Sequence, residues 1–218
     1  MLESLKKPNA ILFDWDNTLV NTWPLIHQAI NVTFKEYGLK PWSLEKVKAN
    51  AHESSREAFP KLFGSQWQEA QKFFYQYVHN FHLEALEAMP GVFSLLSFLR
   101  QENIILGVVS NKRSDLLKKE IQHLKWSDFF HVVVGAGEAE KDKPAPDPIN
   151  LALVRVGLTA SESIWFIGDT IVDWQAAQAS GCQPMAIGEE IQNQNLIPYV
   201  ADCHQLYSFL VNLCKDPH

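Results

Sequence analysis

Residues 10–18 read AILFDWDNT, an apolar run that ends in two aspartates separated by one tryptophan. The run 10–13 has the length and composition of a buried strand, so Asp14 and Asp16 stand at the end of that strand. Because side chains alternate along an extended chain, the two carboxylates lie on the same side and Trp15 faces away from them. A D-x-D pair alone is weak evidence, because so short a motif arises often by chance. The pair gains weight from the residues that the rest of the chain brings to it.

Four further apolar runs recur after residue 103, and helix-like segments separate them. These runs lie at residues 104–111, 131–135, 163–169 and 183–188. Their length and β-branched content are typical of buried strands. Strands that alternate with helices predict a parallel sheet with right-handed crossovers. We therefore expect an α/β fold, a Rossmann-like doubly wound parallel sheet.

Residues 20–88 break this alternation, since they carry no clear strand pattern and are typical of three or four helices. Gly38 and Gly64 are plausible helix ends, and a Met-Pro-Gly step at 89–91 closes the segment. A helical insertion after the first strand predicts a second domain joined by two linkers. We expect residues 1–19 and 89–218 to form the core domain and residues 20–88 to form the helical domain.

Composition excludes several classes of protein. Of the 218 residues, 46% are hydrophobic and 20% are charged, which is an ordinary globular balance. The net charge of −6 argues against a nucleic-acid binder and against a protein held on anionic lipid by charge. The residues before Asp14 contain no apolar stretch of signal-peptide length, and three cysteines without a C-x-x-C motif argue for a reducing compartment. We expect a cytoplasmic monomer or homodimer with no nucleic-acid or membrane partner.

Chemically active residues follow several of the predicted strands. In an open parallel sheet, ligands bind beyond the carboxyl ends of the strands. The side chains expected at this edge are Asp14, Asp16, Ser110, Asn111, Lys143, Asp169 and Asp173. The edge thus collects four carboxylates, a hydroxyl and one or two lysines, since Lys141 is a rival to Lys143. The conjunction is far more specific than any one of its motifs.

The order of these motifs resembles the haloacid dehalogenase superfamily of aspartyl phosphohydrolases. The likeness rests on D-x-D-x-T at 14–18, Ser110, the Lys-Pro step at 143–144 and G-D-x-x-x-D at 168–173. It covers nearly the whole chain, and the insertion at 20–88 stands where phosphoglycolate phosphatase-like members carry a helical cap. One departure is Asn17, where the family usually has glycine. Because Asn tolerates a left-handed backbone better than most residues, we expect the turn to survive.

The resemblance implies a role for each aspartate. Asp14 is the expected nucleophile, since an unperturbed carboxylate is ionised at neutral pH and needs no base to form an aspartyl-phosphate. Asp16 is expected to protonate the leaving oxygen and then to activate water. The implied cofactor is Mg²⁺, held by Asp14, the backbone carbonyl of Asp16 and Asp169. Hard oxygen ligands suit this ion. Asp173 and Thr18 are expected to orient these ligands without binding the metal themselves.

The expected substrate contacts come from three parts of the chain. Ser110 and the neighbouring backbone amides, at Asn111, are expected to bind phosphate oxygens together with Lys143. In the helical insertion, Arg56 is a candidate contact for a substrate carboxylate, although an exposed arginine at a helix start is the more ordinary interpretation. A further group of basic residues, Lys112, Arg113, Lys118 and Lys119, is expected to form a solvated helix face.

The expected function is a Mg²⁺-dependent phosphatase that hydrolyses a small, phosphoglycolate-like phosphomonoester through an aspartyl-phosphate. A β-phosphoglucomutase-like phosphomutase shares all the core motifs and remains an alternative. A pyrophosphatase or a nucleotidase is also open. A non-catalytic binding module is disfavoured, because lost catalysis usually leaves one of the acidic residues replaced.

Overall fold

The protein is described by a computed structural model that covers the chain apart from residues 1, 3, 4, 51–54, 189, 190, 192–195, 197 and 216–218; the side chains of residues 55–57 are also left out. The described chain divides into two compact units. The first comprises Met1–Val20 with Ala88–His218, and the second comprises Asn21–Glu87. None of the described helices is both long and apolar enough to cross a membrane.

The first unit is built on a six-stranded sheet with the order β5-β4-β1-β6-β7-β8, in which every pair is parallel. The strands are β1 (Ala10–Phe13), β4 (Ile105–Arg113), β5 (Val132–Ala136), β6 (Ile164–Gly168), β7 (Gln183–Ile187) and β8 (Tyr199–Val200). The predicted doubly wound parallel sheet is confirmed. The two-residue β8 was not predicted, because its strand pattern is too short to stand out.

Strand β1 occupies the centre of the sheet and all four of its residues are buried. The chain runs from β1 to β4 and β5 on one side, and then returns to β6 on the other side of β1. This reversal makes the carboxyl end of β1 the topological switch point, where open α/β sheets bind their ligands.

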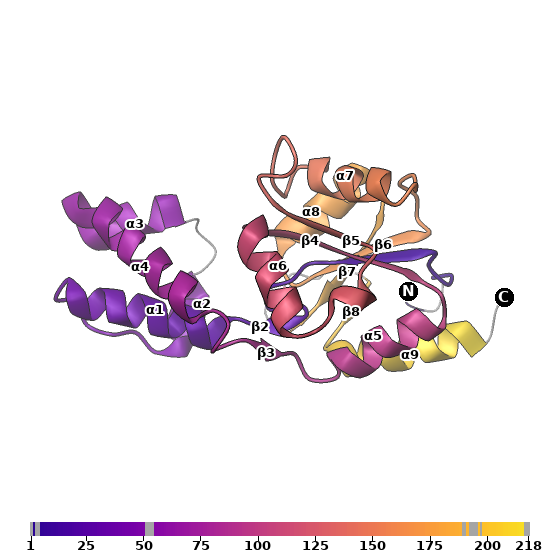
Figure 1. The fold of residues 1–218 in the computed structure, drawn as a ribbon, viewed down its shortest axis with the longest axis horizontal. Helices are drawn as coiled ribbons and strands as arrows, with labels where there is room; N and C mark the ends of the chain where they lie inside the picture. The colour runs from indigo at the N-terminus through magenta and orange to yellow at the C-terminus, as the bar shows by residue number, and fades with distance from the viewer. Residues whose placement is uncertain are drawn as a thin grey trace. The chain divides into compact units, whose positions relative to one another are not determined.

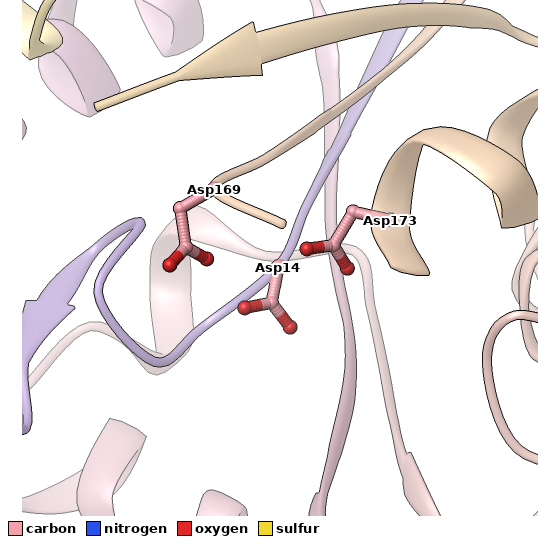
Figure 2. Close-up of side chains that lie close together, drawn as sticks. All are labelled: Asp14, Asp169 and Asp173. Atoms are coloured by element: carbon pink, nitrogen blue, oxygen red, sulfur yellow. The ribbon is translucent and has the colours of Figure 1, made fainter. Parts of the chain in front are cut away.

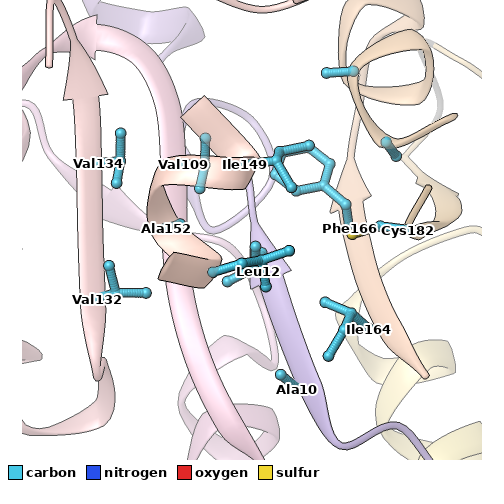
Figure 3. Close-up of a cluster of buried hydrophobic side chains, with 13 residues drawn as sticks. Ala10, Leu12, Val109, Val132, Val134, Ile149, Ala152, Ile164, Phe166 and Cys182 are labelled. Carbon is cyan, nitrogen blue, oxygen red and sulfur yellow. The ribbon is translucent and has the colours of Figure 1, made fainter. Parts of the chain in front are cut away.

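Helices cover both faces of this sheet (Figure 1). They are α5 (Val92–Gln101), α6 (Ser114–His123), α7 (Asp147–Arg155), α8 (Ile171–Ser180) and α9 (Cys203–Lys215). Helices α7 and α8 lie on one face, whereas α5 and α9 pack together on the other. On the α7 side, Ile149 and Ala152 share a buried cluster with Leu12 (Figure 3). Burial on both faces explains why the strands read as continuous apolar runs.

The second unit is helical and has its own core. Its helices are α1 (Trp23–Glu36), α2 (Leu44–Asn50), α3 (Ser55–Phe63) and α4 (Trp67–Phe81). Aromatic rings dominate the core, where Phe59 lies 5.1 Å from Phe63 and 5.5 Å from Phe74 between ring centroids. Two short strands, β2 (Val20–Asn21) and β3 (Glu87–Ala88), pair where the chain passes between the units. The sequence pattern predicts neither of these strands.

A partly buried acidic side chain holds the loop after β5 in place through its hydrogen bonds. Glu138 accepts hydrogen bonds from the Ser114 hydroxyl, from the Gly135 N–H at 3.1 Å, and from Arg155 at 2.8 Å and Lys118 at 3.1 Å. Although burial raises the pKa of Glu138, the hydrogen bonds from Ser114 and Arg155 outweigh burial and lower it to about 2. The folded form therefore favours the ionised carboxylate.

We predict that Glu138→Gln destabilises the fold at neutral pH and that the loss disappears in acid. Because the folded pKa lies below the ordinary value of 4.5, the stabilisation is present above pH 4.5 and fades as the pH falls toward 2. The expected loss at pH 7 is about 1 kcal/mol, because Arg155 and Lys118 are partly exposed and solvent screens them. Urea unfolding at several pH values measures it. The exposed neighbour variant Glu140→Gln is the control, and equal pH profiles for both variants would contradict the assignment.

Candidate active site

The carboxyl end of β1 carries Asp14, which is 7% exposed. Its backbone N–H donates to the carbonyl of Ile167 at 2.9 Å, so the pairing of β1 with β6 continues up to this residue. Its Oδ1 accepts a hydrogen bond of 2.6 Å from the Lys143 ammonium. The central strand thus holds the Asp14 backbone, and a lysine holds one of its two carboxylate oxygens.

Asp169 and Asp173 come to the same place from the end of β6 and the first turn of α8, and their carboxyl groups lie around that of Asp14 (Figure 2). One oxygen from each of the three lies within 4.8 Å of the others. Asp169 Oδ1 accepts from the buried Thr18 hydroxyl at 3.1 Å. All three aspartates are buried. This is a dense group of hard oxygen donors, which suits Mg²⁺.

The glycine that precedes Asp169 is required by close packing. A Cβ on Gly168 would lie 2.4 Å from the Cβ of Asp173, far inside van der Waals contact. Glycine at this position lets α8 begin directly against the end of β6. The spacing of the G-D-x-x-x-D motif therefore has a steric origin in the strand-to-helix turn.

Both carboxylate oxygens of Asp173 accept hydrogen bonds from neighbouring residues. Its Oδ1 accepts from Lys143 at 2.6 Å, and its Oδ2 accepts from the Thr170 hydroxyl at 2.6 Å and the Thr170 N–H at 3.1 Å. Both oxygens are thus engaged by the protein itself. The geometry favours a carboxylate that orients Lys143 over one that binds a ligand directly.

Lys143 is the cation at the centre of this group. It is 5% exposed, and its ammonium donates to Asp14, Asp173 and the carbonyl of Val109, the last at 3.0 Å. Burial lowers the pKa of Lys143, but the charges of Asp14 and Asp173 outweigh burial and raise it above the ordinary value. Lys141, the rival in the sequence, is exposed.

Asn111 holds the loop that carries Lys143. Its Nδ2 donates to the Lys143 carbonyl at 2.9 Å, and its Oδ1 accepts from the Lys143 N–H at 3.0 Å. Asn111, a residue expected at the phosphate, therefore uses both polar groups of its side chain on the backbone of Lys143. Ser110 is 4% exposed, and its hydroxyl accepts from the Lys112 N–H at 3.1 Å. The register of β4 against β5 shifts between Val109 and Arg113, which takes Ser110 out of the regular ladder.

Asp16 lies on the turn after β1, where its side chain is 32% exposed. The next residue, Asn17, has a φ of 59°, so the expectation that asparagine supports a left-handed turn is confirmed. Trp15 is fully buried, as expected for a side chain facing away from the two aspartates. Asp16 Oδ1 accepts a hydrogen bond of 2.7 Å from Lys112.

The expectation that Lys112 lies on a solvated helix face is wrong. Lys112 belongs to the irregular end of β4, and its side chain is only 12% exposed. Its ammonium lies between Asp16 and the buried Glu120 of α6. The sequence did indicate that Lys112 lies near the site, since Lys112 directly follows Ser110 and Asn111 at the end of a predicted strand.

Arg56 is the one predicted contact outside this unit. It lies in α3, and its side chain is not among those described. The loop 51–54 before it also lies outside the described residues.

The negative charge of the three buried aspartates is not fully compensated by the protein. Burial, followed by the charges of Asp173 and Asp16, raises the pKa of Asp14 to about 7 despite the opposing effect of Lys143. Burial and the charges of Asp14 and Asp173 likewise raise the pKa of Asp169 well above its ordinary range. One buried ammonium does not compensate three buried carboxylates. A divalent cation fits both the charge and the donor set.

Known proteins resemble this chain in sequence and in fold. The pyrophosphatase PpaX of Listeria monocytogenes is 30% identical over 173 residues, with 79% of each chain covered, and that of Bacillus cereus is 29% identical over 181 residues, with 83% of each covered. A haloacid dehalogenase-like hydrolase from Streptococcus pneumoniae has 25% identity and a TM-score of 0.80, covering 95% of this chain and 99% of its own. A predicted phosphoglycolate phosphatase from Haemophilus somnus shares the fold at 22% identity, with a TM-score of 0.80 over 92% of this chain and 96% of its own.

The family described as haloacid dehalogenase-like hydrolase matches residues 11–187, a span that runs from β1 to β7 and includes every aspartate of the site. The match covers most of the chain, and the sheet order and site geometry agree with it. This chain belongs to the haloacid dehalogenase-like hydrolase family.

Proposed function

We propose that the protein is a Mg²⁺-dependent phosphatase that hydrolyses a small phosphomonoester through an aspartyl-phosphate on Asp14. The observation that carries this proposal is the buried group of Asp14, Asp169 and Asp173 at the switch point of the sheet, with Lys143 bridging Asp14 and Asp173. A phosphomonoester is doubly anionic, so its hydrolysis needs an in-line nucleophile and fixed positive charge.

The first chemical step is phosphoryl transfer to Asp14. One carboxylate oxygen of Asp14 attacks phosphorus, while Lys143, which donates to Asp14 Oδ1, compensates part of the charge. As the new O–P bond forms, the bond from phosphorus to the leaving oxygen breaks, and Asp16 gives its proton to that oxygen. The products are an aspartyl-phosphate and a free alcohol.

The second step is hydrolysis of the aspartyl-phosphate. Water attacks phosphorus and passes a proton to the Asp16 carboxylate, while the bond from Asp14 to phosphorus breaks. Inorganic phosphate leaves, Asp14 is restored as a carboxylate and Asp16 is restored as an acid. The partial exposure of Asp16 suits a group that exchanges protons in both steps.

Mg²⁺ would be held by Asp14, Asp169 and the backbone carbonyl of Asp16, and when bound it supplies positive charge that compensates the carboxylates and the phosphoryl group. Thr18 fixes Asp169 by its hydrogen bond. Asp173 supports the site by orienting Lys143. Ser110 and Lys143 are the proposed ligands of the phosphoryl oxygens. Because the three N–H donors of Lys143 already bond to Asp14, Asp173 and Val109, substrate binding would redirect one of them to the phosphoryl group. Asn111 acts with them by holding the Lys143 loop.

We also propose that the helical unit works as a cap that selects the substrate. Its residues, 21–87, form a separate compact unit inserted after β1. Arg56 is its proposed contact with a substrate carboxylate. The proposed substrate is a small phosphorylated metabolite.

Pyrophosphate is a second candidate substrate class, because the PpaX relatives are named as pyrophosphatases. The same residues suffice for this reaction, with a phosphate as the leaving group in place of an alcohol. A phosphomutase uses this fold too, but it returns the phosphoryl group to a sugar and releases no net phosphate. Assays of phosphate release from phosphoglycolate, a hexose phosphate, a nucleotide and pyrophosphate rank these alternatives.

We predict that Asp14→Asn lowers the turnover of p-nitrophenyl phosphate with Mg²⁺ by at least about a thousandfold, because the amide is not a nucleophile. Release of p-nitrophenol measures it. The exposed Asp128→Asn variant is the control and is expected to keep the wild-type rate. Equal turnover in wild type and Asp14→Asn would remove Asp14 as the nucleophile.

Asp169→Asn is expected to raise the Mg²⁺ concentration for half-maximal activity by about 10- to 100-fold, since it removes one charged ligand. Titration of activity with Mg²⁺ measures the change, again beside Asp128→Asn. If Asp169→Asn saturates at the wild-type Mg²⁺ concentration, Asp169 is not a metal ligand.

Lys143→Met is expected to lower the free energy of unfolding by about 3 kcal/mol, because it leaves Asp14 and Asp173 buried without their cation. Urea unfolding measures it. Adding Asp173→Asn to this variant should recover part of the loss, since one buried charge is removed. The control is Lys141→Met, at an exposed position. A Lys143→Met protein as stable as that control would contradict the buried ion pairs.

A further inference from the structure

A buried acidic residue beside the site has no part in the chemistry proposed above. Glu120 lies on the inward face of α6 and is only 1% exposed. Its Oε2 accepts a hydrogen bond of 2.6 Å from the Lys112 ammonium and another of 2.6 Å from the Trp15 indole N–H. Burying a charged pair costs free energy of desolvation, so the Lys112–Glu120 pair is not explained by a gain in stability alone. The position of the pair next to Asp16 offers another reason for its presence.

Lys112 bridges this buried anchor to Asp16. Its ammonium donates to Glu120 at 2.6 Å and to Asp16 Oδ1 at 2.7 Å. Burial lowers the pKa of Lys112, but Asp16 and Glu120 outweigh burial and raise it, so the side chain is charged at neutral pH. Because the Lys112 ammonium is held in the core by Glu120, it cannot move with the Asp16 side chain. Instead, it restricts where the Asp16 carboxyl group lies.

Trp15 fixes the same turn from the opposite side of the backbone. Its ring is fully buried and meets Trp126 edge-on at 6.0 Å between centroids. Its carbonyl accepts from the N–H groups of Leu19 at 3.0 Å and Val20 at 3.2 Å, which closes the turn that carries Asp16. Glu120 therefore holds both the indole that anchors this turn and the lysine that contacts its carboxyl group.

We propose that Lys112, anchored by Glu120, is a positioning residue that holds Asp16 for proton transfer to the leaving oxygen. The proposal rests on the proposed function, in which Asp16 is the acid. Lys112 occupies Oδ1 of Asp16, which directs Oδ2 to the proton transfer. Protonated Asp16 keeps this arrangement, because its carbonyl oxygen still accepts from Lys112 while the other oxygen carries the proton. Glu120 also compensates part of the charge of Lys112, so the ammonium orients Asp16 without acting on it as an uncompensated cation.

The test compares two substrates that differ in their need for an acid. Phenyl phosphate must expel phenol, whose pKa is near that of tyrosine, about 10, whereas p-nitrophenolate leaves readily without a proton. The value of kcat/KM is used because it reports the steps up to release of the alcohol and excludes hydrolysis of the aspartyl-phosphate. Lys112→Met is expected to lower kcat/KM for phenyl phosphate by about tenfold more than for p-nitrophenyl phosphate. Lys112→Arg is expected to recover much of the kcat/KM that Lys112→Met loses on phenyl phosphate.

A second variant guards against loss of folding. Lys112→Met leaves Glu120 buried without its cation. The double variant Lys112→Met/Glu120→Gln removes both charges, and it is measured beside the single variant. The same selective loss is expected for the double variant. The matched control is Lys119→Met, a change at an exposed lysine next to Glu120, which should leave both substrates at the wild-type values. An equal fall for both substrates, a change confined to KM, or no change overturns the proposal.

Failure of this proposal can be told apart from failure of the proposed function. Asp16→Asn should show the selective loss on phenyl phosphate, and adding Lys112→Met to it should cause no further selective loss. If Asp16→Asn shows the loss and the Lys112 variants do not, only the positioning role is wrong. If Asp16→Asn treats both substrates alike, its role as the acid fails and the positioning role fails with it.

Discussion

The ammonium of Lys143 is the interaction on which the rest of the site depends. It joins Asp14 at the end of β1 to Asp173 in the first turn of α8, and it contacts the carbonyl of Val109 on β4. Three separate parts of the sheet edge therefore meet at one buried cation. Buried carboxylates are tolerated only when charge and hydrogen bonds compensate them. Without Lys143, the sheet could still form, but its carboxyl edge would hold an uncompensated group of negative charges.

The positions of these residues follow from the sheet order. Because β4 and β6 both pair with β1 in parallel, their carboxyl ends lie beside Asp14 with no further requirement on the loops. Gly168 lets α8 start at once after β6, which brings Asp173 back over the same edge. Local steric rules and parallel pairing thus gather the acidic residues, and the rigid strands hold them for the chemistry that we propose.

A second lysine extends this arrangement to Asp16. Lys143 is enclosed by carboxylates of the site itself, whereas Lys112 connects the site to Glu120 in the core of the same unit. The two cations differ in what they can do. Lys143 compensates the buried charge around Asp14, and Lys112 restrains a carboxyl group that is itself partly exposed. In the function that we propose, Asp16 exchanges protons with substrate and water, so its carboxyl group needs both access to solvent and a fixed position.

The sequence by itself determined the parallel sheet, the helical insertion and the strand-end motifs, because buried parallel strands read as continuous apolar runs and polar residues punctuate their ends. Asn17 and Trp15 were predictable for the same local reasons. The tertiary structure alone decided that Asn111 turns both polar groups to the Lys143 loop and that Lys112 lies between Asp16 and Glu120. Those contacts join residues 32 and 96 positions apart, and such distant pairings arise from packing, which no local pattern in the chain encodes.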